Sequence, residues 1–199
     1  FGPEYNQHGE NNDSPVPTTA TQNRTKVSYW WRTVSNSANS DFAFSATQTD
    51  LSARRMSYIS YSADDNDNLS ITTYGTKYNA NNDGWEWDSI TSDSLEWGKW
   101  YHTTEEITFV DGVAQDIATY TVTDENGNVV FDAQTFSWEA AYYLGDWGAD
   151  QGTIAGVDTW ALNASNKTDI AGQQGLGMVI DDFSMATVPE PASLALLGL

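Results

Sequence analysis

Residues 117–131 read IATYTVTDENGNVVF, and this stretch decides the fold. Threonine, tyrosine and valine alternate before Asp124, and β-branched residues resume at Val129. Such residues at a period of two are typical of a half-buried β-strand. Between the two runs, Asn126-Gly127 suits the positive φ angles of a tight turn. The stretch therefore predicts a hairpin of two antiparallel strands.

The same alternation recurs in several short runs along the chain. Turn residues separate these runs, and no stretch between them has helical periodicity. Strands joined by turns at short intervals, without intervening helices, indicate an antiparallel sandwich or barrel. We therefore expect an all-β fold. Its further strands are expected within residues 26–32, 41–45, 58–61, 69–74, 107–110 and 177–185.

Charge and composition exclude several classes of function. The 199-residue chain has 28 acidic and 8 basic side chains, a formal net charge of -20, and no cysteine. So negative a protein repels nucleic acid and anionic membrane surfaces, so neither is expected as a partner. Without cysteine there is no disulfide, no thiol nucleophile and no thiolate metal site. The length fits one domain with a substantial core.

The chain divides into three zones. Residues 1–25 contain three prolines among polar residues and are expected to form an extended N-terminal arm. Residues 26–187 are expected to form the β-sandwich domain, and residues 188–199 a short apolar tail. Neither an initiator methionine nor a basic, apolar leader begins the chain, as expected of a mature form whose signal peptide has been removed.

The tail carries a short motif. Pro189, Glu190 and Pro191 are followed at once by a small and aliphatic run that extends to Leu199. This arrangement resembles the start of a PEP-CTERM sorting signal, which exosortases recognise on exported bacterial proteins. The resemblance implies secretion, display on the bacterial cell surface or in the extracellular matrix of a biofilm, and the exosortase machinery as a partner during export.

The order of the segments resembles a concanavalin A-like, or laminin G-like, jelly roll. The resemblance rests on an early aromatic strand, a Gly-Lys-Trp-Tyr-His entry to a long strand, the Asn-Gly hairpin and a closing Val-Ile-Asp-Asp-Phe-Ser strand. These are residues 27–32, 98–102, 119–128 and 179–184. Glycoside hydrolases on this fold carry the pattern Glu-x-Asp-x-x-Glu, which is absent here. Since the adjacent Glu105 and Glu106 point to opposite faces of a strand, we expect no enzyme, with a jelly-roll hydrolase or lyase as the less favoured alternative.

Sugar binding is the better small-ligand hypothesis. Tryptophan rings stack on pyranose rings, and neighbouring carboxylates accept hydrogen bonds from hydroxyl groups. The alternative is that the indoles simply fill the core. After a polar loop, Trp85 and Trp87 are expected on one face of a further strand. The candidate carbohydrate-binding residues are Trp85, Glu86, Trp87 and Asp88, with Trp147 in a glycine-rich segment.

Structural calcium is a weaker hypothesis. Residues 64–68 concentrate oxygen ligands, and Asp181 matches an aspartate that helps to bind calcium in sandwiches of the resembled family. The loop lacks the glycine and distal glutamate of an EF-hand, so a solvated turn is the alternative. The candidate ligands are Asp64, Asp65, Asp67 and Asp181.

Self-assembly is the leading functional hypothesis. An extended arm can add to a neighbour's sheet edge, and an apolar tail can fill a neighbour's groove. We therefore expect a non-enzymatic extracellular protein that forms a filament or matrix with copies of itself, with a polysaccharide-binding module as the alternative. The candidate assembly residues are Phe1, Tyr5, Leu194, Leu196 and Leu197.

Overall fold

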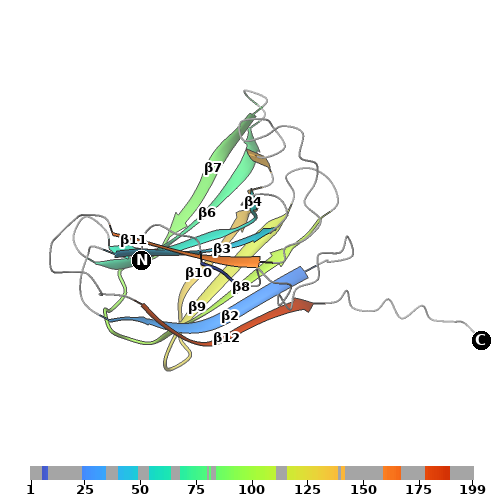
Figure 1. Cartoon of the computed structure of the whole chain (residues 1–199). Coiled ribbons are helices and arrows are strands. Elements are labelled where there is room, and N and C mark those ends of the chain that lie inside the picture. The colour runs from blue at the N-terminus through green and yellow to red at the C-terminus, as the bar shows by residue number, and fades with distance from the viewer. Residues whose placement is uncertain are drawn as a thin grey trace, which may run out of the picture.

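Two antiparallel β-sheets pack face to face in the part of the chain that the computed structural model describes (Figure 1). The described residues are 6–8, 24–34, 40–48, 54–63, 68–79, 81, 84–110, 116–138, 140–141, 159–166 and 178–188. Buried side chains from both sheets form one hydrophobic cluster between them. The prediction of an all-β antiparallel sandwich is confirmed.

The seven-stranded sheet has the order β1-β11-β3-β5-β6-β7, with the short β4 paired to β3. Its strands are β1 (Asn6–His8), β3 (Ser40–Gln48), β4 (Arg54–Arg55), β5 (Tyr58–Ala63), β6 (Leu69–Asn79), β7 (Gly84–Thr91) and β11 (Thr159–Asn166). Most strands here were predicted in part, whereas β1, β4 and β11 were not. Figure 1 shows that the free end of the β6–β7 hairpin tilts away from the other sheet.

The five-stranded sheet has the order β10-β9-β8-β2-β12. Its strands are β2 (Arg24–Thr33), β8 (Tyr101–Thr108), β9 (Ile117–Asp124), β10 (Val129–Phe136) and β12 (Met178–Val188). The alternation in β2 places Val27, Tyr29 and Trp31 in the core with no exposed surface. At roughly 2 kcal/mol for each large buried side chain, this one strand contributes strongly to folding.

The core also contains polar groups that bond across the two sheets. The hydroxyl of Tyr61 (β5) lies 2.6 Å from that of Tyr29 (β2) and 2.9 Å from that of Thr103 (β8). Glu105 on β8 is completely buried in the same layer. Burial raises the pKa of Glu105 to about 8, and the nearby Ser57 hydroxyl lowers it in part. Glu105 is therefore a neutral acid at pH 7.

The predicted hairpin joins β9 to β10, but its turn differs in detail from the expected one. Gly127 has a φ of 82°, whereas Asn126 is not among the described residues with positive φ. One carboxylate oxygen of Asp124 accepts hydrogen bonds from the main-chain N–H groups of Asn126 and Asn128, both at 2.8 Å. The Asn128 side-chain N–H donates to the other carboxylate oxygen at 2.9 Å and lowers the pKa of Asp124 most, and the main-chain bonds lower this pKa further. The aspartate thus fixes the turn, and only the glycine requires a left-handed backbone.

The first and last strands of the five-stranded sheet extend slightly beyond the expected limits of the sandwich domain. Strand β2 begins at Arg24 and β12 ends at Val188, so each takes in a residue or two that the sequence assigned to a terminal segment. Within the arm, β1 pairs with β11 at the edge of the seven-stranded sheet. Across the described ranges, no helix has both the length and the apolar character that a membrane crossing requires.

Candidate carbohydrate-binding site

Strand β7 positions the two candidate tryptophans at an edge of the seven-stranded sheet. Its partner is β6, and the register places Trp85 opposite Tyr78 and Trp87 opposite Thr76. Side chains directly opposite each other in an antiparallel pair share a face, and residues two apart on one strand do so as well. Tyr78, Trp85 and Trp87 therefore lie together on one face of the hairpin.

The two tryptophans form part of a continuous series of aromatic contacts. The rings of Trp85 and Trp87 meet edge to face, with centroids 5.1 Å apart and planes at 87°. Trp87 also meets Trp138, at 5.0 Å and 75°. Trp138 in turn stacks on Tyr58 at 5.7 Å. Edge-to-face pairs of this kind are worth about 1 kcal/mol beyond the area that they bury, so Trp87 is held in a fixed orientation.

Trp138 anchors this series to the fold. It is 5% exposed, and its indole nitrogen donates to the carbonyl of Tyr74 at 2.8 Å. The residues leaving β10 run beside β6, because the Thr76 N–H donates to the Ser137 carbonyl at 3.2 Å. Trp138 was not predicted as a site residue, since no sequence pattern shows that the end of β10 meets β6.

The aromatic residues of the β6–β7 hairpin differ in how much of each side chain is exposed. Trp87 is 48% exposed and Tyr78 is 50% exposed, whereas Trp85 is half-buried. We call Tyr78, Trp85 and Trp87 the tryptophan surface. The interpretation that both tryptophans fill the core does not fit Trp87, nearly half of which is accessible to a ligand.

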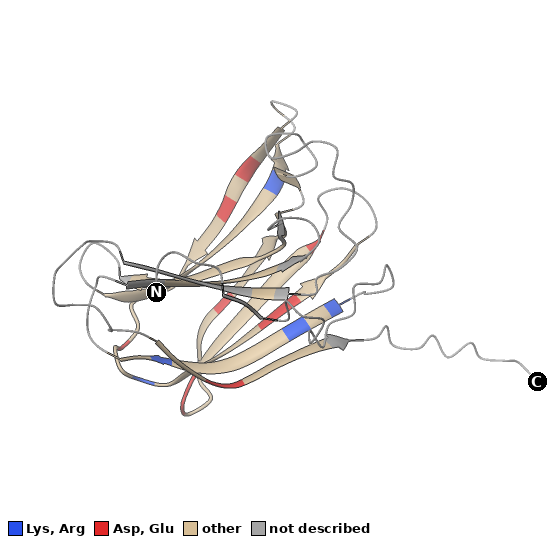
Figure 2. Ribbon diagram, in the orientation of Figure 1, with Lys and Arg blue, Asp and Glu red and all other residues tan. Residues whose placement is uncertain are grey.

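Glu86 and Asp88 occupy the other face of the same strand. They alternate with the tryptophans and lie opposite Lys77 and Gly75 of β6. The Lys77 ammonium lies 3.4 Å from a carboxylate oxygen of Glu86 and 3.8 Å from one of Asp88. Figure 2 shows these two acidic positions on β7 beside the basic one on β6. The two carboxylates therefore do not flank the tryptophan surface as the sequence suggested.

Most of the other predicted site residues lie outside the described residues. Asp181 lies on β12, is exposed, and accepts a hydrogen bond from the Asp182 N–H at 2.9 Å. No group of three or more potential metal ligands occurs among the residues that the structure describes. The predicted residues outside this part are Trp147, Asp64, Asp65, Asp67, Phe1, Tyr5, Pro189, Glu190, Pro191, Leu194, Leu196 and Leu197.

The paired glutamates of β8 do not form a catalytic pair. Glu105 is completely buried between the sheets, whereas Glu106 points outward and binds Arg24. A carboxyl group with no exposed surface does not reach a polymeric substrate. The two residues therefore have separate roles, one in the core and one on the outer face.

Comparisons with known proteins return structures that share the β-sandwich form. No protein-family model and no curated protein sequence matches the chain. A SAP-like pentraxin of Limulus polyphemus is 15% identical, with a TM-score of 0.40 over 83% of this chain and 65% of that one. The CBM2 module of an evolved Dit of Lactobacillus casei BL23 phage J-1 is 12% identical, with a TM-score of 0.48 over 83% and 62%.

A third similar structure matches over almost its full length. Sheep galectin-11 is 7% identical, with a TM-score of 0.43 over 93% of this chain and 98% of that one. The chain spans less than two thirds of the length of the pentraxin and phage structures.

Proposed function

We propose that the protein binds a neutral polysaccharide through the tryptophan surface and performs no chemistry on it. The observation that carries the proposal is the orientation of Trp87. Its ring is 48% exposed at a sheet edge and is held by edge-to-face contacts with Trp85 and with the buried Trp138. A ring that is already immobile loses little entropy when a sugar ring stacks on it.

The polar surroundings suit a sugar with hydroxyl groups and no charge. Ser89 is exposed on the same face as Trp87, and Asn79 and Asn81 lie at the free end of the hairpin. Glu86 and Asp88 are turned to the opposite face, where Lys77 offsets part of their charge. The tryptophan surface itself thus carries no ionised group. Two carboxylates against one ammonium leave this strand pair locally negative, so a neutral polymer approaches the surface more readily than an anionic one.

Replacing Trp87 with alanine is expected to weaken polysaccharide binding about tenfold or more, because an exposed, rigid tryptophan is the residue type that most often dominates binding energy. The free energy of unfolding should fall by roughly 2–3 kcal/mol, from the two lost ring contacts and the buried half of the indole, which leaves the protein folded. The measurement is retardation in native gels containing hydroxyethylcellulose, xylan or galactomannan, with thermal unfolding recorded in parallel.

Val129→Ala is the control. Val129 is 60% exposed at the beginning of β10, beside the β9–β10 turn, so its truncation also removes exposed apolar surface, but from the other sheet and away from β6. The control should be retarded like the unmodified protein. If neither variant changes retardation, or if the intact protein is not retarded by any of these neutral polymers, the tryptophan surface is not a polysaccharide site.

Self-assembly is a second candidate, and the position of β1 favours it. This three-residue strand forms the outer edge of the seven-stranded sheet through pairing with β11. Residues 9–23 join it to β2 in the other sheet, and a chain of that length can extend over roughly 50 Å. A short edge strand on so long a connection can pair with β11 of a second copy instead, and head-to-tail exchange of this kind builds a filament.

Deleting residues 1–22 tests the exchange, because β2 and its buried Thr25 are retained. The truncated protein should fold and remain monomeric in light scattering after gel filtration, while the intact chain forms larger species in proportion to its concentration. Assembly through β1 is excluded if the intact chain is monomeric at every concentration, or if the truncated chain assembles equally well.

Export belongs to the same proposal. The motif from Pro189 to Pro191 is what supports it, with exosortase machinery as the partner at that stage. A binding or assembling sandwich with an acidic surface then functions on the cell surface or in a polysaccharide-rich matrix.

Calcium binding at Asp181 stays a prediction. If calcium is bound, a chelator should lower the unfolding temperature, because a ligand that binds only the folded state stabilises it. An unchanged unfolding temperature would exclude a stabilising calcium ion.

A further inference from the structure

The outer face of the five-stranded sheet carries a concentration of basic side chains along one strand. Alternate residues of β2 point away from the core, as its burial pattern shows. Three of these outward residues are basic, although the whole chain has only eight lysines and arginines. Figure 2 shows two of the basic positions near the beginning of β2. The outward residues are Arg24, Lys26, Ser28, Trp30 and Arg32.

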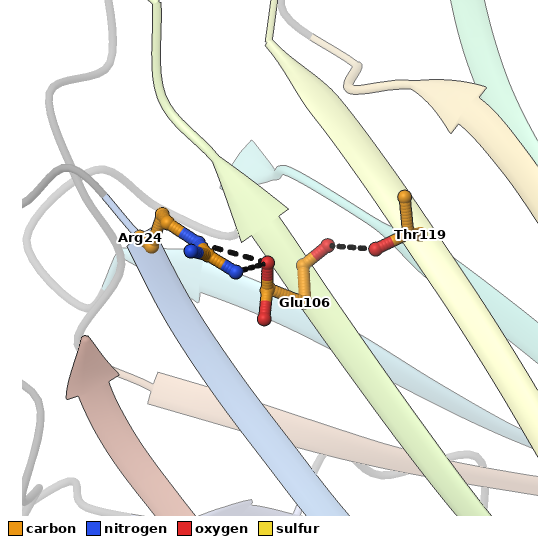
Figure 3. Close-up of polar contacts among 3 residues, drawn as sticks. All are labelled: Arg24, Glu106 and Thr119. Atoms are coloured by element: carbon orange, nitrogen blue, oxygen red, sulfur yellow. Dashed lines mark hydrogen bonds and ion pairs between the residues drawn. The ribbon is translucent and has the colours of Figure 1, made fainter.

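Lys26 keeps its charge available on this face. The carboxylate of Glu106, which lies opposite Lys26 on β8, accepts hydrogen bonds from both Nε and Nη2 of Arg24, the former at 2.8 Å. Figure 3 shows this pair, with the Glu106 main-chain carbonyl bound to the Thr119 hydroxyl. On its other side Lys26 lies opposite Ala186. Lys26 forms no ion pair with any described residue, and its ammonium is exposed.

An aromatic pair lies further along the same strand. Trp30 is half-buried, and its ring centroid lies 5.0 Å from that of His102, its partner on β8. Burial, and then the charge of Lys26, lower the pKa of His102, while Asp182 raises it. His102 is therefore an uncharged support for the indole at neutral pH. The partly exposed face of the Trp30 ring can stack on a sugar ring.

Hydroxyl groups fill the space between the lysine and the tryptophan. Ser28 lies between them on β2, and its hydroxyl is 2.8 Å from that of Ser184 on β12. Thr104 lies opposite Ser28 on β8. The face thus presents, in order along β2, the Lys26 ammonium, a patch of hydroxyls, the Trp30 indole and the Arg32 guanidinium, which lies over the Trp100 ring at 5.1 Å from its centroid. The aspartates at the bulge of β12 lie at the indole end, since Asp181 is the partner of Trp30.

We propose that this face binds a carboxylated polysaccharide, one built from uronic acid units. A pyranose ring stacks on Trp30, hydroxyls of the next unit bond to Ser28 and its neighbours, and a carboxylate further along meets Lys26. At about 3.3 Å per residue, Lys26 and Trp30 are roughly 13 Å apart along the strand, so one sugar ring does not reach both. The Arg32 guanidinium at the indole end already contacts the Trp100 ring and has Asp181 and Asp182 near it along the strand pair, so the carboxylate is placed at Lys26.

The negative charge of the whole protein does not prevent this. Exposed charges further apart than about 8 Å are largely screened at physiological salt, whereas the contact between Lys26 and a bound carboxylate is short. Binding should therefore weaken as salt is raised, because that ion pair is itself exposed. This site is separate from the tryptophan surface, which belongs to the other sheet and is proposed for neutral polymers.

The test uses polygalacturonate and its fully methyl-esterified form, compared by titration calorimetry. Lys26→Gln should weaken binding of polygalacturonate about fivefold to tenfold, as expected for a hydrogen-bonded ion pair, and leave the weaker binding of the ester unchanged. Trp30→Ala should weaken binding of both polymers. Trp30→Phe keeps an aromatic ring at this position, so it should retain part of the affinity for each polymer and shows that the loss in Trp30→Ala is not caused by disturbance of the sheet. Lys77→Gln is the control, because it removes the same charge from the other sheet.

Four results would overturn the proposal. The first is an equal loss of polygalacturonate affinity in Lys26→Gln and Lys77→Gln, which would indicate an effect of net charge alone. The second is binding of the methyl ester as tight as that of polygalacturonate, and the third is no binding of polygalacturonate by the intact chain. The fourth is loss of polygalacturonate binding in Trp87→Ala. The last result would mean one site on the tryptophan surface, whereas loss of neutral polymers alone in that variant leaves the two sites distinct.

Discussion

Replacing Glu105 with glutamine is expected to make the stability of the protein much less dependent on pH. The Glu105 side chain has no exposed surface, and neither carboxylate oxygen has a hydrogen-bond partner among the described residues. Ser57 is near enough to lower the pKa in part, yet burial dominates and raises it from 4.5 to about 8. A glutamine of nearly the same shape does not ionise at any of these pH values.

The direction follows from proton binding in the two states. Below about pH 4.5 the carboxyl is protonated in both the folded and the unfolded protein, so it adds no pH dependence. Between pH 4.5 and 8 only the folded protein keeps the proton, so unfolding becomes easier as the pH rises. Above pH 8 the carboxyl is ionised in both states, and the folded protein carries the full cost of a buried charge. Over this range the stability of Glu105→Gln relative to the unmodified protein should increase by on the order of 4 kcal/mol.

Denaturant unfolding at a series of pH values measures this difference. The buried amide of Glu105→Gln has its own desolvation cost, so the slope with pH is the diagnostic quantity, not the offset. Glu125→Gln, in the exposed β9–β10 turn, is the control and should run parallel to the unmodified protein. A constant difference between Glu105→Gln and the unmodified protein from pH 5 to pH 9 would show that Glu105 keeps an ordinary pKa.

Gly75→Ala is the second change with a large expected effect. A Cβ built on Gly75 of β6 would lie 2.0 Å from the carbonyl oxygen of Phe136 and 2.9 Å from Cβ of Thr135. The obstructing oxygen belongs to the main chain, so it does not rotate aside as a side chain would. Separating β6 from the end of β10 should cost about 3 kcal/mol or more in the free energy of unfolding.

The Gly75 variant is best compared with Gly127→Ala. At Gly127 nothing lies within 4 Å of the added atom, and the cost comes only from its φ of 82°, about 1 kcal/mol. Chemical denaturation should therefore rank Gly75→Ala well below Gly127→Ala in stability. Equal losses would mean that the close approach between β6 and β10 is not a tight contact.

The fold was largely predictable, because alternation along each strand decides which side chains are buried. Tyr29 and Trp31 on β2 are an example, and the hairpin after Asp124 formed where Asn-Gly placed it. The turn chemistry was only partly predicted, since Asp124 and Gly127 suffice without a left-handed Asn126. Strand β11 was missed although Trp160 and Leu162 alternate with smaller residues, because its alanines and asparagines are poor strand formers.

The site was less predictable, because it depends on contacts between segments far apart in the sequence. Spacing placed Trp85 and Trp87 on one face of a strand, as the register with β6 has them. The same alternation turns Glu86 to the opposite face, which the choice of Glu86 as a neighbouring candidate did not take into account. It did not reveal Trp138, which meets Trp87 only because the end of β10 runs beside β6. The burial of Glu105 likewise depends on which face of β8 meets the other sheet.

Binding of a neutral sugar at the tryptophan surface can be followed by NMR through the indole N–H signals of the nine tryptophans while a neutral oligosaccharide is added. We expect the signals of Trp87 and Trp85 to shift in a saturable way, and those of the buried Trp31 and Trp160 to stay in place. A shift centred on other tryptophans, or no saturable shift with any neutral oligosaccharide that corresponds to the polymers above, would contradict the account.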